Sequence, residues 1–108
     1  MKSASLSEMT KGWFVGDFTP SMFQTRAAEV AIKHYRAGER ETWHVHRVGT
    51  EITAVVSGKV RMADRELGAG SIVRLDPGEG TDFLAVEDST TVVVKVPSVR
   101  GDKYLAGE

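Results

Sequence analysis

The sequence contains no cysteine among its 108 residues. This absence excludes disulfides, zinc–thiolate sites and cysteine nucleophiles, so any metal ion must be held by histidine, aspartate or glutamate. Long apolar runs are also missing, and no stretch approaches the length of a membrane span. Residues 1–10 lack the apolar run of a secretory signal, so we expect a cytoplasmic protein without a membrane partner.

Neither sign of charge is in excess. The formal net charge is −1, and the chain has no run of lysine and arginine. Nucleic acid is therefore not an expected partner, because its phosphates are bound by clustered basic residues. With 41% hydrophobic and 27% charged residues, the composition is typical of a single soluble globular domain.

Eleven glycines separate short runs that are rich in β-forming residues, a pattern typical of an all-β domain. Nothing from Glu29 onward has a helical apolar stripe of useful length. Several short, closely spaced strands predict a barrel or sandwich, in which sheet edges are removed or shielded. The expected strands cover residues 29–35, 42–46, 51–57, 59–63, 71–75, 83–86 and 90–96.

Residues 1–25 differ from the rest because four aromatic residues crowd into a segment that also contains glycine and proline. We interpret this segment as an irregular N-terminal arm or an edge strand. It would be laid over the β-barrel domain of residues 26–108, or across a partner subunit. The aromatic residues are Trp13, Phe14, Phe18 and Phe23.

Two of the three histidines, His44 and His46, are two residues apart. On a strand this spacing puts both imidazoles on one face, where they suit a divalent first-row metal. Glu51 opens the next expected strand. If the two strands pair, its carboxylate lies beside the imidazoles and coordination positions stay open for water or substrate.

The spacing of Gly38, His44, His46, Glu51 and Gly58 resembles the first sequence motif of the cupins, with every landmark residue present. The resemblance covers roughly residues 29–96. It implies a cupin-type double-stranded β-helix, or jelly-roll barrel. It also implies one divalent ion per chain (Fe, Zn, Mn or Ni) inside the mouth, held by the two histidines and the glutamate.

Residues 70–82 resemble the second cupin motif with departures. Gapless matching places Asp76 at the motif's proline and Thr81 where the family usually has a fourth ligand, a histidine. Sliding by one residue places Asp82 there instead. Asp82 is therefore a candidate fourth ligand or catalytic base, with a solvated turn carboxylate as the alternative.

Lys95 interrupts a β-branched run and is a second candidate catalytic residue. Inside a barrel it would need a carboxylate or an anionic ligand as partner, whereas an exposed Lys95 would blunt a sheet edge. Lys33 and Tyr35 share one strand face and are candidates for lining the cavity. We interpret His34, on the other face, as a hydrogen-bonded core or edge histidine.

The resemblance supports a metalloenzyme, such as an isomerase, lyase or dioxygenase, acting on a small polar molecule like a sugar or an organic acid. The fold does not choose among these reactions. Two alternatives stay open: a non-catalytic module that binds or senses a small ligand, and a structural partner in an assembly. The resemblance also implies a homodimer.

Overall fold

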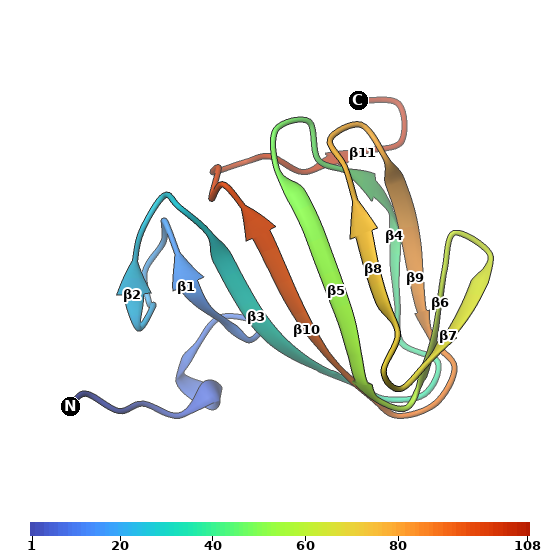
Figure 1. The fold of residues 1–108 in the computed structure, drawn as a ribbon, viewed down its shortest axis with the longest axis horizontal. Helices are drawn as coiled ribbons and strands as arrows, with labels where there is room; N and C mark the ends of the chain where they lie inside the picture. Colours follow the sequence, from blue (N-terminus) through green and yellow to red (C-terminus); the bar gives the residue numbers. More distant parts are fainter.

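The computed structural model describes all residues from 1 to 108, and its eleven strands form two sheets (Figure 1). The six-stranded sheet has the spatial order β2 (Phe23–Gln24), β1 (Trp13–Gly16), β3 (Glu29–Tyr35), β10 (Ser89–Val96), β5 (Thr50–Ser57) and β8 (Ile72–Leu75). The five-stranded sheet has the order β11 (Tyr104–Leu105), β4 (Arg40–Val45), β9 (Gly80–Ala85), β6 (Lys59–Met62) and β7 (Arg65–Gly68). The one helical element, the 3-10 turn η1 (Leu6–Glu8), is far too short to cross a membrane.

The predicted all-β architecture of two sheets is confirmed, and most strand bounds agree with expectation within two residues. Three differences concern the second half of the chain, one of them the short strand β11 at residues 104–105, which was not expected. Residues 65–68 form β7, which was not expected. The strand expected to begin at Phe83 begins at Gly80, because Gly80 and Thr81 pair with the end of β4.

The N-terminal segment contributes strands to the six-stranded sheet. β1 pairs antiparallel with β3, and β2 continues the sheet as its edge (Figure 1). The approach of β1 to β3 requires glycine at position 12. A Cβ atom there would lie 2.0 Å from the carbonyl oxygen of Ile32, and the φ of Gly12 is +83°, a value that other residues rarely adopt. We expected either an irregular arm or an edge strand in residues 1–25. Residues 13–16 and 23–24 are strands added at the edge of the sheet.

The interior changes from polar to apolar along the barrel axis. On β5 the inward-facing residues run from Glu51 through Thr53 to Val55, and all three are buried. On β9 they run from Thr81 to Phe83 and Ala85 in the same sense. One end of the barrel is therefore closed by an apolar core, and the other end is open and polar. The core consists of Val55, Val60, Met62, Phe83 and Ala85.

The outer surface of the six-stranded sheet is aliphatic. Cross-strand partners on this side are apolar pairs, such as Val92 with Ile32 and Ala54 with Ile72. Ile72 is 73% exposed and Val56 is 57% exposed. We call this surface the aliphatic face; it consists of Val30, Ile32, Ile52, Ala54, Val56, Ile72, Val92 and Val94.

We propose that a second copy of the chain covers the aliphatic face. Monomeric proteins rarely expose a continuous apolar patch of several strands, and sheets pack face to face through such surfaces. Its one charged neighbour in register is Arg74, which lies opposite Ile52 on the edge strand β8 and forms an ion pair with Asp76, so the face offers little for a partner of opposite charge to recognise. Another uncharged, aliphatic sheet surface is its best complement, and a two-fold axis would supply one.

Placing charges on the aliphatic face should therefore separate the two copies. We expect the wild-type chain to sediment at twice its 11.8 kDa mass. The Val56→Glu/Ile72→Glu variant should dissociate at roughly 100-fold higher concentration, because it would bury unpaired carboxylates. The matched control is Val48→Glu, since Val48 is 52% exposed on the loop between β4 and β5. A wild-type monomer in sedimentation velocity would contradict the proposal.

Candidate metal centre

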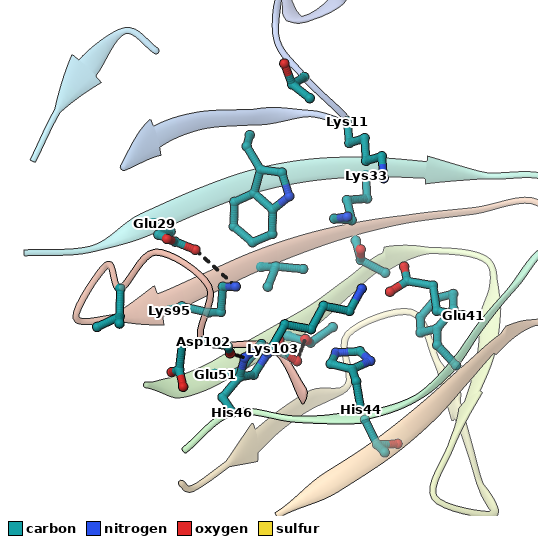
Figure 2. A pocket seen from close by; sticks show the side chains of 18 of the residues that line it. Lys11, Glu29, Lys33, Glu41, His44, His46, Glu51, Lys95, Asp102 and Lys103 are labelled. Carbon is teal, nitrogen blue, oxygen red and sulfur yellow. Dashed lines mark hydrogen bonds and ion pairs between the residues drawn. The ribbon is translucent and has the colours of Figure 1, made fainter. Parts of the chain in front are cut away.

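His44, His46 and Glu51 come together at the open end of the barrel. One ligand atom from each lies within 4.8 Å of the others, and His46 Nε2 is 3.2 Å from Glu51 Oε1. The two imidazole rings meet edge to face at 5.3 Å between centroids. The three side chains point into the same cavity in Figure 2.

The way in which the carboxylate reaches the imidazoles differs from expectation. β4 and β5 do not pair: β4 lies between β11 and β9, whereas β5 lies between β10 and β8. Glu51 therefore approaches from the six-stranded sheet and the histidines from the five-stranded sheet. The three groups meet across the barrel interior instead of along one sheet.

Backbone carbonyls orient both imidazoles. His46 Nδ1 contacts the carbonyl oxygen of Asp102, and His44 Nδ1 lies 3.2 Å from that of Thr42. A carbonyl oxygen only accepts hydrogen bonds, so Nδ1 carries the proton in each ring and donates it. In the neutral form of each ring Nε2 then has no proton and can bind a metal, which is the usual arrangement at metal sites. Without a metal, a protonated His46 can instead donate from Nε2 to Glu51.

Asp102 also fixes the loop that joins the histidine strand to the glutamate strand. Its Oδ1 accepts from the backbone N–H of Arg47 at 2.8 Å, and its Oδ2 accepts from that of Gly49 at 2.8 Å. The N–H of Val48 lies 3.2 Å from both oxygens. Burial would raise the pKa of the Asp102 carboxyl, but these three backbone donors lower it. The carboxylate thus holds the loop, while the carbonyl of the same residue holds His46.

The pKa values of the three ligands reflect their mutual contacts. The hydrogen bond to Glu51 outweighs burial and raises the pKa of His46, whereas burial lowers the pKa of His44. Burial alone would raise the pKa of Glu51, but the His46 hydrogen bond and the imidazole charges lower it. Glu51 is therefore an ionised ligand, as a metal site requires.

A cavity of about 1100 Å³ opens beside the three ligands. Glu41 and Tyr35 face each other in it, and the tyrosine hydroxyl donates to Glu41 Oε2 at 2.5 Å. Burial, followed by this hydrogen bond, raises the pKa of Tyr35. The phenol therefore stays protonated and orients the carboxylate.

Glu41 faces the interior because of an irregularity in β4. Strict alternation from His44 and His46 would point Glu41 outward. The register between β4 and β9 shifts between Glu41 and His44, so both side chains line the cavity. Trp43, within the shifted segment, packs on the outside against Gly80, where a Cβ atom would lie 2.2 Å from the indole.

Lys95 lies inside the barrel mouth, with a side chain that is 18% exposed. Its ammonium is 3.0 Å from Glu29 Oε1 and 4.8 Å from the centroid of Trp13. The alternative of an exposed edge lysine is therefore wrong, and the ion pair is the one that an interior Lys95 requires. Lys95 lines the same cavity as the metal group.

Of the two alternatives for Asp82, the solvated carboxylate agrees with the structure and the ligand or base does not, because Asp82 does not line the cavity. It is exposed on the outer face of β9, where Oδ1 accepts from the N–H of Ala63 at 3.3 Å. Thr81 faces inward instead, opposite His44 in the β4–β9 pairing. The gapless match to the second motif was therefore the right one. The Thr81 hydroxyl donates to the Asp82 carbonyl at 2.7 Å.

The other candidates divide between inside and outside as the strand pattern predicts. Lys33 and Tyr35 both line the cavity. His34 lies on the outer face of β3, where its Nδ1 is 2.9 Å from the hydroxyl of Thr90, so it is an exposed histidine with a partner. Sequence reasoning missed Glu41, which the register shift turns inward, and Asp102, which lies outside every motif.

The sequence matches no family model and no curated protein, but its structure resembles many solved ones. A conserved double-stranded β-helix protein of uncharacterised function from Klebsiella pneumoniae subsp. pneumoniae superposes with a TM-score of 0.73 at 23% identity. That match covers 99% of this chain and 93% of the other. A cupin protein from Bacteroides fragilis gives a TM-score of 0.59 at 26% identity, covering 74% of each chain. The DMSP lyase DddQ from Ruegeria pomeroyi gives 0.72 at 17% identity, covering 87% of this chain and 49% of the lyase.

The Asp102 contacts predict a linked loss of stability and of metal affinity. Asp102→Ala leaves three backbone N–H groups without an acceptor and should lower the free energy of unfolding by about 2 to 4 kcal/mol. It should also weaken divalent-metal binding by roughly 10- to 100-fold, because the loop holding His46 and Glu51 loses its clamp.

Chemical denaturation and metal titration would measure the two effects. Asp102→Asn, which keeps one acceptor oxygen, should fall between wild type and Asp102→Ala. Asp88→Ala is the control, because it removes a carboxylate that accepts from the N–H of Ala37 away from the ligands. It should lose stability without losing metal affinity. Equal metal affinity in Asp102→Ala and wild type would refute the positioning role.

Proposed function

The chain has the cupin fold, a double-stranded β-helix, and from this premise we propose that it is a metal-dependent enzyme acting on a small polar molecule. The proposed cofactor is one divalent ion per chain, either iron, zinc, manganese or nickel, held by His44, His46 and Glu51. The proposed reaction is an isomerisation or an elimination in the adjoining cavity. Dioxygenase chemistry is the variant that iron would favour.

The arrangement of electron pairs at the three ligands supports a cation most directly. Because each Nδ1–H is donated to a carbonyl, a neutral His46 presents an unprotonated Nε2 to the Glu51 carboxylate at 3.2 Å. Two electron-pair donors at that distance repel each other unless a positive charge lies between them. A proton would satisfy this one pair, whereas a divalent cation would satisfy His44 as well.

Two histidines and one carboxylate leave coordination positions open, and a cation there would polarise a carbonyl or hydroxyl oxygen of a bound molecule. Glu41 supplies the proton acceptor that such a reaction needs. Tyr35 occupies Glu41 Oε2, which fixes the carboxylate and leaves Oε1 available to the cavity. Glu41 would take a proton from carbon or oxygen and return it at another atom, as isomerases and lyases require.

The alternative is a non-catalytic module that binds a small ligand. The fold itself does not decide, since it serves many reactions, and the lyase from Ruegeria pomeroyi shows only that one elimination enzyme shares it. Glu41 favours the enzyme, because a binding module has no need of a free carboxylate oxygen beside a metal group.

Metal content tests the proposal without any substrate. Purified wild-type protein should contain about one divalent ion per chain by elemental analysis, and His44→Ala/His46→Ala should contain almost none. Chelation should lower the melting temperature of the wild type but not that of the double variant, because a metal that binds the folded state stabilises it. His34→Ala is the matched control, since His34 is the third histidine and lies on the outer face. Equal metal content in all three proteins would overturn the proposal.

Proton exchange tests the role of Glu41. The metal-loaded protein would be incubated in D₂O with sugars and organic acids, and loss of C–H signals would be followed by NMR. Glu41→Gln, which keeps an acceptor for Tyr35, should slow exchange by roughly 10²- to 10⁴-fold with unchanged metal content. Glu66→Gln, a change in an exposed carboxylate paired with Lys59, should have no effect. No exchange with any compound would favour the binding module.

A further inference from the structure

The acidic side chains that line the cavity all have donors close to them. This holds for the carboxylates at the metal group and for those at the rim. The partners are Lys95 for Glu29, Arg100 for Asp17, Tyr35 for Glu41, His46 for Glu51, and the N–H groups of residues 47–49 for Asp102. Apart from Glu51 at the proposed metal group, each carboxylate of the cavity therefore has a donor other than the remaining lysines.

Three lysines of the same cavity have no such partner. Lys11, Lys33 and Lys103 line it, and none of them forms an ion pair. Lys33 projects from the inner face of β3, Lys11 from the loop before β1, and Lys103 from the segment before β11. Figure 2 shows Lys11 and Lys33 near each other above the cavity and Lys103 extending past His46 toward Glu41.

The three ammonium groups are close enough to affect one another. Burial lowers the pKa of Lys33, the Glu41 carboxylate opposes this as the largest effect of a charge, and the smaller effects of Lys103, Lys95 and Lys11 lower the pKa further. Lys103 also acts on the other side of the cavity, where its charge helps to lower the pKa of His44. Lys33 is half-buried, whereas Lys11 and Lys103 are exposed at the rim of the cavity. Like charges gathered at one cavity repel one another, and a bound anion would relieve that repulsion.

Trp13 completes the subsite with an apolar surface. The centroid of its indole is 5.2 Å from the ammonium group of Lys33 and 4.8 Å from that of Lys95. Cation–π contact holds both side chains in the cavity. Because β1 supplies Trp13, the N-terminal segment forms part of the wall of the pocket.

We propose that Lys11, Lys33 and Lys103 form a carboxylate subsite, and that the ligand of this protein is a small organic acid. Its carboxylate would lie among the three lysines and its carbon skeleton against Trp13. A second oxygen group would reach the His44–His46–Glu51 centre. This second contact rests on the proposed metal function, whereas the lysine subsite stands on its own.

A carboxylate fits the subsite better than a phosphate. Phosphate sites are commonly built from a helix N-terminus or a row of backbone N–H groups, and the chain has only a three-residue helical turn, which does not line the cavity. Separate lysine ammonium groups act as point charges that one or two carboxylate oxygens can satisfy. The volume of about 1100 Å³ admits a compact acid readily.

Calorimetric titration with succinate, its uncharged analogue succinamide, and inorganic phosphate tests the subsite. The metal-free protein should bind succinate in a salt-sensitive manner and should not bind succinamide. Lys33→Gln and Lys103→Gln should each weaken succinate binding by about tenfold, the loss expected for a charge-assisted hydrogen bond. Lys59→Gln is the matched control, because Lys59 pairs with Glu66 and Glu87 on the outside. Metal-loaded protein should bind succinate more tightly than metal-free protein.

The outcomes separate the subsite from the metal function. If Lys33→Gln and Lys103→Gln bind succinate as well as the wild type does, or if phosphate binds and succinate does not, the subsite is refuted even when metal binds. If succinate binding depends on the lysines but no variant or wild-type protein holds metal, the subsite stands and the metal function fails. If metal does not change the affinity for succinate, only the proposed contact between the ligand's second oxygen group and the His44–His46–Glu51 centre is refuted.

Discussion

The candidate site depends on how Asp102 holds the loop between His46 and Glu51. The two histidines belong to one sheet and the glutamate to the other, so no strand pairing sets the distance between them. The connecting loop does so, and its three N–H groups are fixed by the Asp102 carboxylate while the Asp102 carbonyl fixes the ring of His46. One residue near the C-terminus therefore couples loop shape to ligand orientation, and β11 brings it there by pairing with β4.

This dependence explains what the sequence could and could not predict. The spacing of His44, His46 and Glu51 predicted their convergence, because it determines strand faces and a short connection. It could not distinguish pairing within one sheet from contact across a barrel, since both place the groups at the same end. The inward turn of Glu41 was not predictable from alternation, because the register shift that causes it arises only when β4 pairs with β9. The choice between Thr81 and Asp82 stayed open for a related reason: β9 begins three residues earlier than expected, and alternation along it points Thr81 inward and Asp82 outward.

Charge partners were the least predictable feature. Lys95 and Glu29 are 66 positions apart and become neighbours only because β10 pairs with β3 in the register that sets them opposite each other. The same pairing brings Lys33 onto the inner face without a carboxylate partner. From the sequence, Lys95 could lie inside the barrel or at an exposed edge, and Lys33 was a candidate for lining the cavity. The sheet register makes one of them part of the wall and leaves the other free to meet a ligand.

The placement of polar groups inside the barrel has a consequence for stability. The mouth buries Glu29, Glu51 and Thr53 where a purely structural barrel would bury aliphatic side chains, so the apolar core is confined to the closed end. Many aliphatic residues of the six-stranded sheet lie on its outer surface, where folding of one chain alone leaves them partly in water. A barrel that hollows its interior for a polar ligand thus gives up hydrophobic stabilisation within the chain. Covering the aliphatic face with a second copy would restore it without filling the cavity, which links the proposed dimer to the proposed site.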